Sequence, residues 1–459
     1  MDFKNYLVPG KTGLLIGIGG VSMSPLAEVL HDAGLDIRGS DMAESSNTLT
    51  LRERGIPIYI GHSADNVTDD ISFVIRTAAV HDDNPEVHEA HRRGIPVFER
   101  TQAWGALMRG YQNALCISGT HGKTTTTSMC THIMMAAEKD PTVMIGGTLP
   151  LLKACHRVGK GNTIIMESCE YYNSFLALNP TIAVVLNIEA DHLDFFKDLE
   201  DIKHSFRCFA ERVPAETGTV IANYDDANTM DALRGIARKV ITFGLNAKAD
   251  VYAQNIVHRG SVSEFDIYHR GNYFARVTLH VPGIHNVRNA ATAAAIVLGV
   301  SPNAVKYGLA GFEGAGRRFD FKGKFQGADL YDDYAHHPSE LRALLDAVDT
   351  LNYQRTIVVF QPHTYSRTAK LFNDFVEQLR RPTIVYLAEI YAAREKNTIG
   401  ISSADLAAQI PGAKFYPTFA EIERELRRIA RPGDIILTVG AGDVFRIGEH
   451  LLQQSDSEN

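Results

Sequence analysis

The stretch from Ile117 to Thr127, ISGTHGKTTTT, holds residue types that bind phosphate. An apolar run precedes it and a segment with helical spacing follows, so backbone N–H groups and a helix N-terminus would surround one point, which is an anion site. We expect Lys123 to contact the outer phosphates and the hydroxyl of Thr124 to face Mg²⁺. Ile117 stands where the longer G-x-x-x-x-G-K-[ST] pattern has its first glycine, so the loop is a shorter type. An ordinary strand-to-helix turn with a surface lysine is the alternative.

Two further apolar runs end in residues that could hold a metal ion. Glu167 directly follows TIIM, and Asp191 and His192 come soon after IAVVLN. In a parallel sheet, residues just beyond the carboxyl ends of the strands line one crevice. A carboxylate there can hold Mg²⁺, and a neutral imidazole is a feasible additional ligand. A structural role for the histidine is the alternative.

The stretch PGIHNVRNAATAAA places two amides on one helix face. Asn286 and Asn289 are three residues apart, and amides both donate and accept hydrogen bonds, which suits an adenine edge. A helix cap formed by Asn286 accounts for the same spacing.

The stretch YDDYAHHPSEL places Asp333 and His336 at a strand-to-helix turn, where an aspartate could bond a ribose hydroxyl. Arg317 and Arg318 precede it. An arginine at a domain junction can stabilise charge on a transferring phosphoryl group, or it can simply pair with acids across the junction.

Glycines near the start also indicate a nucleotide loop. Gly17 and Gly19 follow an apolar run, and Asp41 ends the second expected strand. The pattern predicts a diphosphate at a helix N-terminus and a polar contact to the sugar or base. Ser22 stands at the third glycine of G-x-G-x-x-G, so the loop does not select nicotinamide. An NAD(P)-dependent oxidoreductase is the alternative from another class.

Alternating strands and helices run through the whole chain and predict an α/β fold with three domains in series. We place the domains at residues 1–110, 111–314 and 315–459. Alternation and turn signals between residues 249 and 281 predict a small antiparallel sheet within the central domain.

Composition limits the function classes. The 459 residues are 45% hydrophobic and 22% charged, with a net charge of −8, which argues against a general nucleic-acid or membrane-surface binder. The five cysteines form no C-x-x-C pair, which argues against a zinc site and against a disulfide framework. No stretch approaches 18 uninterrupted apolar residues, and we expect a cytoplasmic protein.

The order of these motifs resembles the Mur ligase family, which builds the peptide of bacterial cell-wall precursors. The resemblance runs nearly end to end. The motifs that carry it are GIGG with Met23-Ser24, GSD at Gly39–Asp41, GTHGKTTT, NIEADHLD, GIHNVRNA, GAGRRFDFKG, DDYAHHPSE and FQPHTYSRT.

The resemblance implies ATP-dependent amide formation through an acyl phosphate. It implies ATP and Mg²⁺ as cofactors, with Mn²⁺ as the alternative metal, and UDP-N-acetylmuramate and L-alanine as small-molecule substrates. The three domains would be a Rossmann-like UDP-sugar-binding domain, a P-loop ATPase-like domain and a Rossmann-like amino-acid-binding domain. Because each would bind a different substrate, the resemblance also implies a closing motion that completes the active site. We expect a monomer or weak homodimer. A murein tripeptide ligase and a non-catalytic P-loop protein are the alternatives.

The family's functional positions fall on these residues. The catalytic set is Lys123, Thr124, Glu167, His192 and Arg318, of which Thr124, Glu167 and His192 would hold the metal. The ATP set is Gly119, Thr120, His121, Gly122, Lys123, Thr124, Thr125, Asn286, Asn289, Arg318, Asp333 and His336. The UDP-sugar set is Gly19, Gly20, Ser40, Asp41 and Thr77, and the amino-acid set is His363 and Arg367.

One stretch departs from the family pattern. Where the best-known relatives have E-A-D-E-S-D-x-S-F, residues 167–175 read ESCEYYNSF, so Cys169 and Tyr171 replace an acid and a serine. Thr364 follows His363 where an arginine is common, which bears on amino-acid selectivity.

Overall fold

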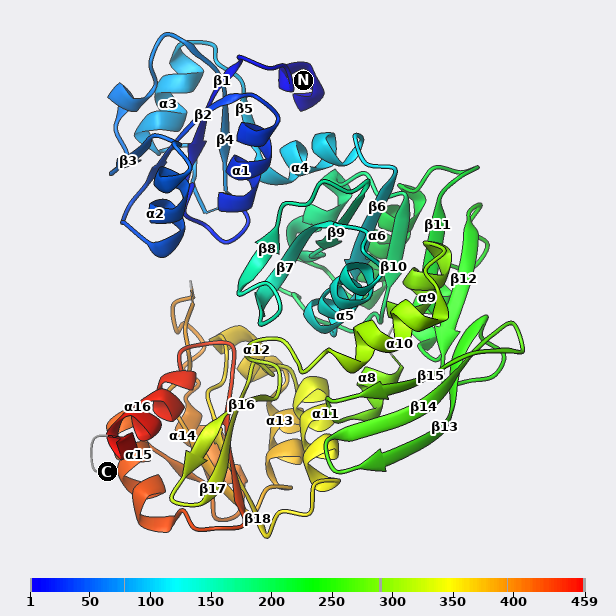
Figure 1. Ribbon diagram of the computed structural model, residues 1–459. Helices are drawn as coiled ribbons and strands as arrows, with labels where there is room; N and C mark the ends of the chain where they lie inside the picture. The colour runs from blue at the N-terminus through cyan, green and yellow to red at the C-terminus, as the bar shows by residue number, and fades with distance from the viewer. Residues whose placement is uncertain (1, 78, 289–290, 394, 457–459) are drawn as a thin grey trace. The chain divides into compact units, whose positions relative to one another are not determined.

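The computed structural model describes residues 2–77, 79–288, 291–393 and 395–456. It contains three sheets that follow one another along the chain (Figure 1). The predicted α/β class with three domains in series is therefore confirmed. Asn289, one of the amides predicted from the sequence, lies outside the described residues.

The first sheet is parallel and has the strand order β3-β2-β1-β4-β5. Its strands are β1 (Thr12–Ile16), β2 (Asp36–Asp41), β3 (Ile58–Ile60), β4 (Ile71–Arg76) and β5 (Val97–Glu99). Its helices are η1 (Phe3–Tyr6), α1 (Ser24–Asp32), α2 (Ser46–Glu53), η2 (Ala64–Asn66), α3 (Pro85–Arg92) and α4 (Arg100–Met108).

Helices cover both faces of this sheet because β1 is apolar on both sides. All five residues of β1 are buried. Leu15 belongs to the core cluster that includes residues of α1 and α2, whereas Leu14 and Ile16 pack with Val87 of α3 on the other face. Such a doubly wound arrangement brings the carboxyl ends of the strands to one edge, where ligands bind in this class of fold.

The second sheet has ten strands in the order β15-β14-β13-β12-β11-β10-β6-β9-β7-β8. The strands of its central part are β6 (Asn113–Ser118), β7 (Thr142–Leu149), β8 (Ala154–Arg157), β9 (Thr163–Glu167), β10 (Ile182–Val185), β11 (Thr219–Asn223) and β12 (Lys239–Gly244). They pair in parallel except for the antiparallel β7–β8 pair. Helices of this region are α5 (Lys123–Ala136), η3 (Tyr171–Ala177), α6 (Leu199–Glu211), α7 (Ala227–Ala232), α8 (Ile284–Val287), α9 (Ala291–Val297) and α10 (Pro302–Ala310).

The segment predicted as a small antiparallel sheet forms β13 (Val251–Arg259), β14 (Val262–His269) and β15 (Asn272–Leu279). Two-residue turns join these neighbouring strands, as in β-hairpins. They are not a separate sheet, because β13 pairs in parallel with the end of β12 through Phe243 and Val251.

The third sheet has the order β16-β17-β21-β18-β19-β20, in which β16 pairs antiparallel with β17 and the other pairs are parallel. Its strands are β16 (Asp320–Phe325), β17 (Ala328–Asp333), β18 (Arg355–Phe360), β19 (Ile384–Leu387), β20 (Lys414–Phe415) and β21 (Asp434–Val439). Its helices are α11 (Pro338–Asp349), α12 (Tyr365–Lys370), α13 (Phe372–Leu379), α14 (Ser403–Gln409), α15 (Phe419–Ile429) and α16 (Phe445–Asp456). Alternate residues of β18 belong to two separate core clusters, so helices again cover both faces.

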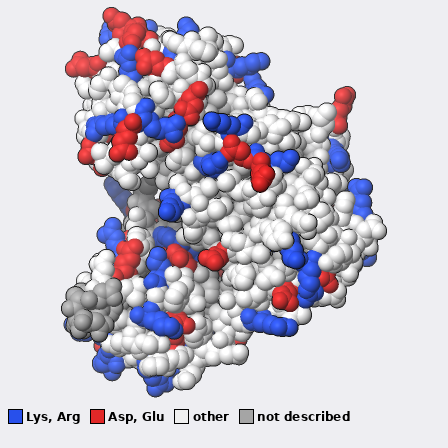
Figure 2. Space-filling view, viewed as in Figure 1, with Lys and Arg blue, Asp and Glu red and all other residues white. Residues whose placement is uncertain are grey.

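By residue contacts the chain divides into two compact units. Unit 1 comprises residues 1–252, 268–275 and 289–308, and unit 2 comprises residues 253–267, 276–288 and 309–459. The units are described separately below, and the domain limits at 110/111 and 314/315 stay predictions. Figure 2 shows Lys and Arg interspersed with Asp and Glu on the face in view. None of the helices in the described ranges is long and apolar enough to cross a membrane.

Candidate active site

The phosphate-binding loop predicted from the sequence lies between the buried strand β6 and helix α5 in unit 1. Gly119 has φ +149° and Gly122 has φ +83°, conformations that residues with a side chain rarely adopt. A Cβ at Gly119 would lie 2.7 Å from the Cβ of Leu186, so a side chain has no room there. Gly122 is the N-cap of α5, which therefore begins at Lys123 with its first backbone N–H groups directed at the loop.

Lys123 is held by its own loop and by one carboxylate. Its Nζ donates to Gly119 O at 2.5 Å and to Thr120 O at 3.0 Å, and lies 3.0 Å from Glu170 Oε2. The Glu170 side chain is buried, and that of Lys123 is partly buried, with 14% of it exposed. Burial by itself lowers the pKa of Lys123 and is the largest single effect, but the acidic neighbours, Glu170 first and then Cys169 and Glu167, together outweigh it and raise that pKa above its ordinary value. The ammonium is therefore charged at neutral pH.

A second carboxylate lies on the other side of the loop. Glu167, the last residue of β9, accepts a hydrogen bond from Thr124 Oγ1 at 3.1 Å through Oε1 and from Gly146 N at 2.6 Å through Oε2. Hydroxyl and carboxylate oxygens are the ligands that Mg²⁺ prefers.

His192 lies beyond the end of β10 and has the left-handed backbone conformation, φ +51°. Its Nε2 is 3.8 Å from Glu170 Oε1 and 3.8 Å from Asp191 Oδ2. Glu170 therefore connects the imidazole to Lys123. Lys123 and His192 thus meet at Glu170, and Thr124 meets Glu167 beside them; hydroxyl, carboxylate and imidazole are donor types that a divalent cation accepts.

The other residues of the loop are fixed by the β10–α6 connection. Thr120 Oγ1 accepts from Glu189 N at 2.9 Å. The side-chain amide of Asn187 makes two hydrogen bonds to the backbone of His121: Oδ1 accepts from His121 N at 2.8 Å, and Nδ2 donates to His121 O at 3.0 Å. Thr125 follows in the first turn of α5.

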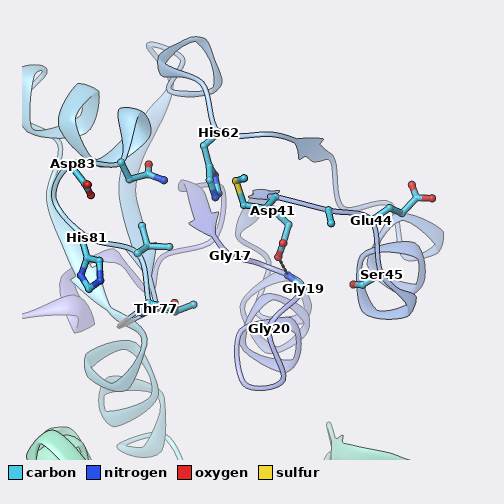
Figure 3. Close-up of a pocket in the computed structure, with 15 residues that line it drawn as sticks. Gly17, Gly19, Gly20, Asp41, Glu44, Ser45, His62, Thr77, His81 and Asp83 are labelled. Carbon is cyan, nitrogen blue, oxygen red and sulfur yellow. Dashed lines mark hydrogen bonds between the residues drawn. The ribbon is translucent and has the colours of Figure 1, made fainter. Parts of the chain in front are cut away.

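A separate pocket of about 670 Å³ lies at the carboxyl ends of the strands in the first sheet (Figure 3). Gly17, Gly19 and Asp41 of the predicted nucleotide loop line it, and so do Gly20 and Thr77, which the family resemblance assigned to the UDP-sugar set. Asp41 Oδ2 accepts from Gly19 N at 2.8 Å, which ties the end of β2 to the glycine loop.

Ser40 is not a lining residue. Its side chain is fully buried, and its hydroxyl donates to Glu86 Oε2 at 2.7 Å. Ser40 O accepts from Gly17 N at 2.8 Å and from Ile18 N at 3.0 Å. Ser40 therefore supports the loop from behind instead of facing the pocket.

The sequence reading missed His62, which lines this pocket. Its Nδ1 is 2.7 Å from Glu86 Oε2, and Asn66 Nδ2 donates to Glu86 Oε1 at 2.6 Å. The buried Glu86 thus fixes the imidazole. His62 follows β3 by two residues, so the strand-end rule that pointed to Asp41 would also have found it.

In unit 2, the predicted Asp333 ends β17 at the turn into α11. It accepts from Phe319 N at 2.7 Å and from Ala335 N at 2.8 Å. Burial raises the pKa of Asp333 to about 6 despite the nearby guanidinium of Arg318.

The two arginines of the junction differ. Arg318 lies over the ring of Tyr334 at 4.9 Å. Arg317 Nε donates to Asp332 Oδ2 at 2.8 Å, and its Nη atoms donate to Gly440 O and Gly442 O. Arg317 therefore has the structural, acid-paired role that the sequence left open.

His363 and Arg367, predicted for the amino acid, lie together with His336. Arg367 Nη1 is 3.2 Å from His363 Nδ1. The ring of His363 is 5.7 Å from that of His336 and is stacked at 5.7 Å on Tyr391, which the sequence reading missed. Asn286 is also in unit 2, where its Nδ2 donates to Pro282 O at 2.6 Å.

Comparison with known proteins matches all three parts of the chain. Residues 15–112 match the Mur ligase family, catalytic domain; residues 117–297 match the Mur ligase middle domain; and residues 317–442 match the Mur ligase, glutamate ligase domain. The chain belongs to the Mur ligase family, and the resemblance read from the sequence is confirmed.

Similar relatives within the family carry one name. The chain is 46% identical to the UDP-N-acetylmuramate–L-alanine ligase of Agathobacter rectalis over 96% of this chain and 97% of the relative. It is 44% identical to that of Clostridium novyi over 99% and 100%. The crystal structure of the UDP-N-acetylmuramate–alanine ligase of Thermotoga maritima superposes with a TM-score of 0.80 at 28% identity, covering 98% of this chain and all of the other.

Proposed function

We propose that this protein joins L-alanine to the lactyl carboxylate of UDP-N-acetylmuramate at the expense of ATP, as a cytoplasmic step in peptidoglycan precursor synthesis. The activity named for its relatives supports the substrates. The observation that carries the ligase chemistry is the charged, partly buried Lys123 in a glycine loop, beside two carboxylates and an imidazole.

The reaction needs an activated carboxyl group because the oxygen of a carboxylate is a poor leaving group. The lactyl carboxylate attacks the γ-phosphorus of ATP, ADP leaves, and an acyl phosphate forms. The neutral amine of L-alanine then attacks the carbonyl carbon, and phosphate leaves from the tetrahedral intermediate. Water must be excluded, because it would hydrolyse the acyl phosphate.

We assign the phosphate contacts to unit 1. Lys123 binds the β- and γ-phosphates, and the loop from Gly119 to Thr125 presents its N–H groups to them. Thr124, Glu167 and His192 would hold Mg²⁺, or Mn²⁺ in its place, which offsets negative charge on the phosphates. Glu170 keeps Lys123 charged and oriented.

We assign the UDP group to the pocket lined by Gly19, Gly20, Asp41 and Thr77, with Ser40 behind the loop. In unit 2, Asp333 and His336 contact the ribose side of the nucleotide, and Arg318 contacts a phosphate.

Asn286 and Asn289 serve the adenine. His363 and Arg367 bind the amino acid, whose carboxylate a guanidinium holds in a bidentate manner. We also propose that the domains end at the limits given above and that the protein is a monomer or a weak homodimer.

A substrate panel tests this function. Purified protein with ATP, Mg²⁺ and UDP-N-acetylmuramate is offered L-alanine, L-serine, glycine or the murein tripeptide, and phosphate release and product mass are measured. We expect release with L-alanine and a product heavier by one alanyl residue. Release with the tripeptide but not with alanine would identify a murein tripeptide ligase. Binding of NAD(P)H without ATP-dependent product would favour the oxidoreductase.

A further inference from the structure

Tyr171, one of the departures from the family pattern, contacts His192, which is proposed above as a ligand of the divalent cation. The ring of Tyr171 stacks on the imidazole of His192, with ring centroids 4.4 Å apart and an interplanar angle of 24°. Its hydroxyl donates to Asp194 Oδ2 at 2.5 Å. Two contacts therefore join Tyr171 to the connection that carries His192.

The backbone on both sides of this stack is held in an uncommon conformation. Tyr172 and Asn173 have φ values of +53° and +55°, and His192 has +51°. Asn and His adopt this conformation more readily than most residues, but a bulky residue such as Tyr172 keeps it only where the surroundings impose it, and such residues cluster at functional sites.

The segment is anchored from behind. Asn173 N donates to Glu170 O at 2.8 Å, and the buried Phe175 stacks on Phe209 of α6 at 4.6 Å. The ring of Tyr171 is thus presented from a fixed point.

General packing does not account for the stack. The neighbouring rings, Tyr172 and Phe195, are 62% and 36% exposed, so this aromatic group faces solvent and is not part of the core. What the stack does define is the plane of the imidazole. With that plane fixed, His192 Nε2 lies on the side of Glu170, the carboxylate that also holds Lys123.

We propose that Tyr171 is a positioning residue, which fixes the ring of His192 by stacking and thereby sets the geometry of the divalent-cation site beside the phosphate loop. The proposal rests on the function proposed above for that site. Stacking is the main contact and the exposed hydrogen bond to Asp194 is secondary. A phenyl ring at this position should therefore suffice, whereas an aliphatic side chain of similar size should not.

Three variants separate these cases. Tyr171→Phe keeps the ring and loses the hydroxyl. Tyr171→Leu keeps apolar volume without a ring, and Tyr171→Ser is a second ringless variant should the leucine distort the segment. Tyr307→Ala, at a 66% exposed tyrosine on α10, is the control for loss of a surface ring.

The first measurement needs neither nucleotide nor metal. Carbethoxylation of His192 by diethyl pyrocarbonate is followed by mass spectrometry of its peptide. An aromatic pair contributes an energy that corresponds to roughly two- to tenfold in an equilibrium. We expect His192 to react two- to tenfold faster in Tyr171→Leu and Tyr171→Ser, and at the wild-type rate in Tyr171→Phe and Tyr307→Ala. Equal carbethoxylation rates in the wild type and all variants would show that the stack does not constrain the ring of His192, and would overturn the proposal.

The second measurement uses Mn²⁺ with ADP, titrated by electron paramagnetic resonance. We expect the Kd of Mn²⁺ to rise by the same two- to tenfold in the ringless variants only. An unchanged Kd alongside faster carbethoxylation would show that the stack orders the ring without serving the cation, and would also overturn the proposal. If the wild-type protein does not ligate L-alanine, the proposed function is refuted. The carbethoxylation rates would still show whether Tyr171 constrains the ring of His192.

Discussion

Replacing Lys123 by Met tests whether the charge of Lys123 stabilises the buried carboxylate of Glu170 beside the phosphate loop. Methionine keeps the length of the side chain but removes the ammonium that lies 3.0 Å from Glu170 Oε2. The side chain of Glu170 is 3% exposed, so its carboxylate would stay buried without that partner. Breaking a buried pair from one side costs about 3–5 kcal/mol. Since His192 Nε2 lies 3.8 Å from the same carboxylate, we expect a loss near the lower limit, about 3 kcal/mol.

The double variant Lys123→Met/Glu170→Gln separates stability from catalysis. Removing the orphaned charge should restore about 2 kcal/mol of the loss, because a neutral amide costs less to bury than a carboxylate. Ligation should nevertheless stay reduced by roughly 10²–10³-fold, the usual effect of losing one charge-stabilising group. Stability is followed by hydrogen exchange of peptides from β6 and α5 in urea, and ligation by phosphate release.

Lys203→Met is the matched control, because the Lys203 side chain is as covered as that of Lys123 (13% against 14% exposed) but pairs with Glu200 and Asp231, which are 75% and 41% exposed. It should change stability by less than about 1 kcal/mol and leave ligation intact. A Lys123→Met protein as stable as wild type, or a double variant as unstable as the single, would refute the assignment of Glu170 as the compensated charge.

The pH dependence follows from the raised pKa of Lys123. The stability from the ion pair is fully present below the ordinary lysine pKa of about 10.4 and is lost only as pH rises through the higher folded-state pKa. The loss in Lys123→Met should therefore be equal at neutral and mildly alkaline pH.

Four further predictions concern the other parts of the chain. Asp41→Ala removes the acceptor of Gly19 N and should weaken UDP binding by about tenfold in calorimetry, with ADP binding unchanged; equal UDP affinity would contradict the pocket assignment. Glu86→Ala removes the acceptor of one buried donor, the Ser40 hydroxyl, and of the part-buried His62 and Asn66, and should cost about 3 kcal/mol in hydrogen exchange of the first sheet, more than Glu86→Gln; equal losses in the two variants would show that the carboxylate is not needed to hold these three groups. Because the pKa of Asp333 is raised to about 6, its contribution to stability is present below the ordinary aspartate pKa and is lost as pH rises through about 6. Asp333→Asn should remove that slope in urea unfolding of the third sheet, and a retained slope would exclude Asp333 as its source. Arg367→Lys should raise the KM for L-alanine about tenfold without changing that for ATP, since lysine lacks the bidentate fork; an unchanged KM would place the amino acid elsewhere.

Local patterns carried most of what the sequence could predict. The three sheets follow from alternating strands and helices, and the phosphate loop is contiguous, so its glycines and lysine are visible together. The alternation within residues 251–279 predicted strands correctly but not their attachment to β12, because nothing in a strand's own pattern specifies which edge it joins.

Contacts between distant residues could not be read in this way. Ser40 has the right position for a pocket residue, yet its side chain turns to Glu86, 46 positions away. Tyr171 was visible only as a departure from a pattern. Its meaning depends on His192, which a different strand brings beside it.

The left-handed backbone at Tyr172, Asn173 and His192 bears on how the activity of this enzyme depends on temperature. For a bulky residue such as Tyr172 this conformation costs about 1–3 kcal/mol, a large share of the roughly 5–15 kcal/mol that holds a typical domain together, whereas Asn adopts it more readily. The packing behind this segment, where Phe175 stacks on Phe209, offsets that backbone strain. Because Phe209 is itself fully buried in the core, a smaller residue there would free the segment and destabilise the surrounding fold at the same time. Such a change should therefore lower the temperature at which ligation is lost.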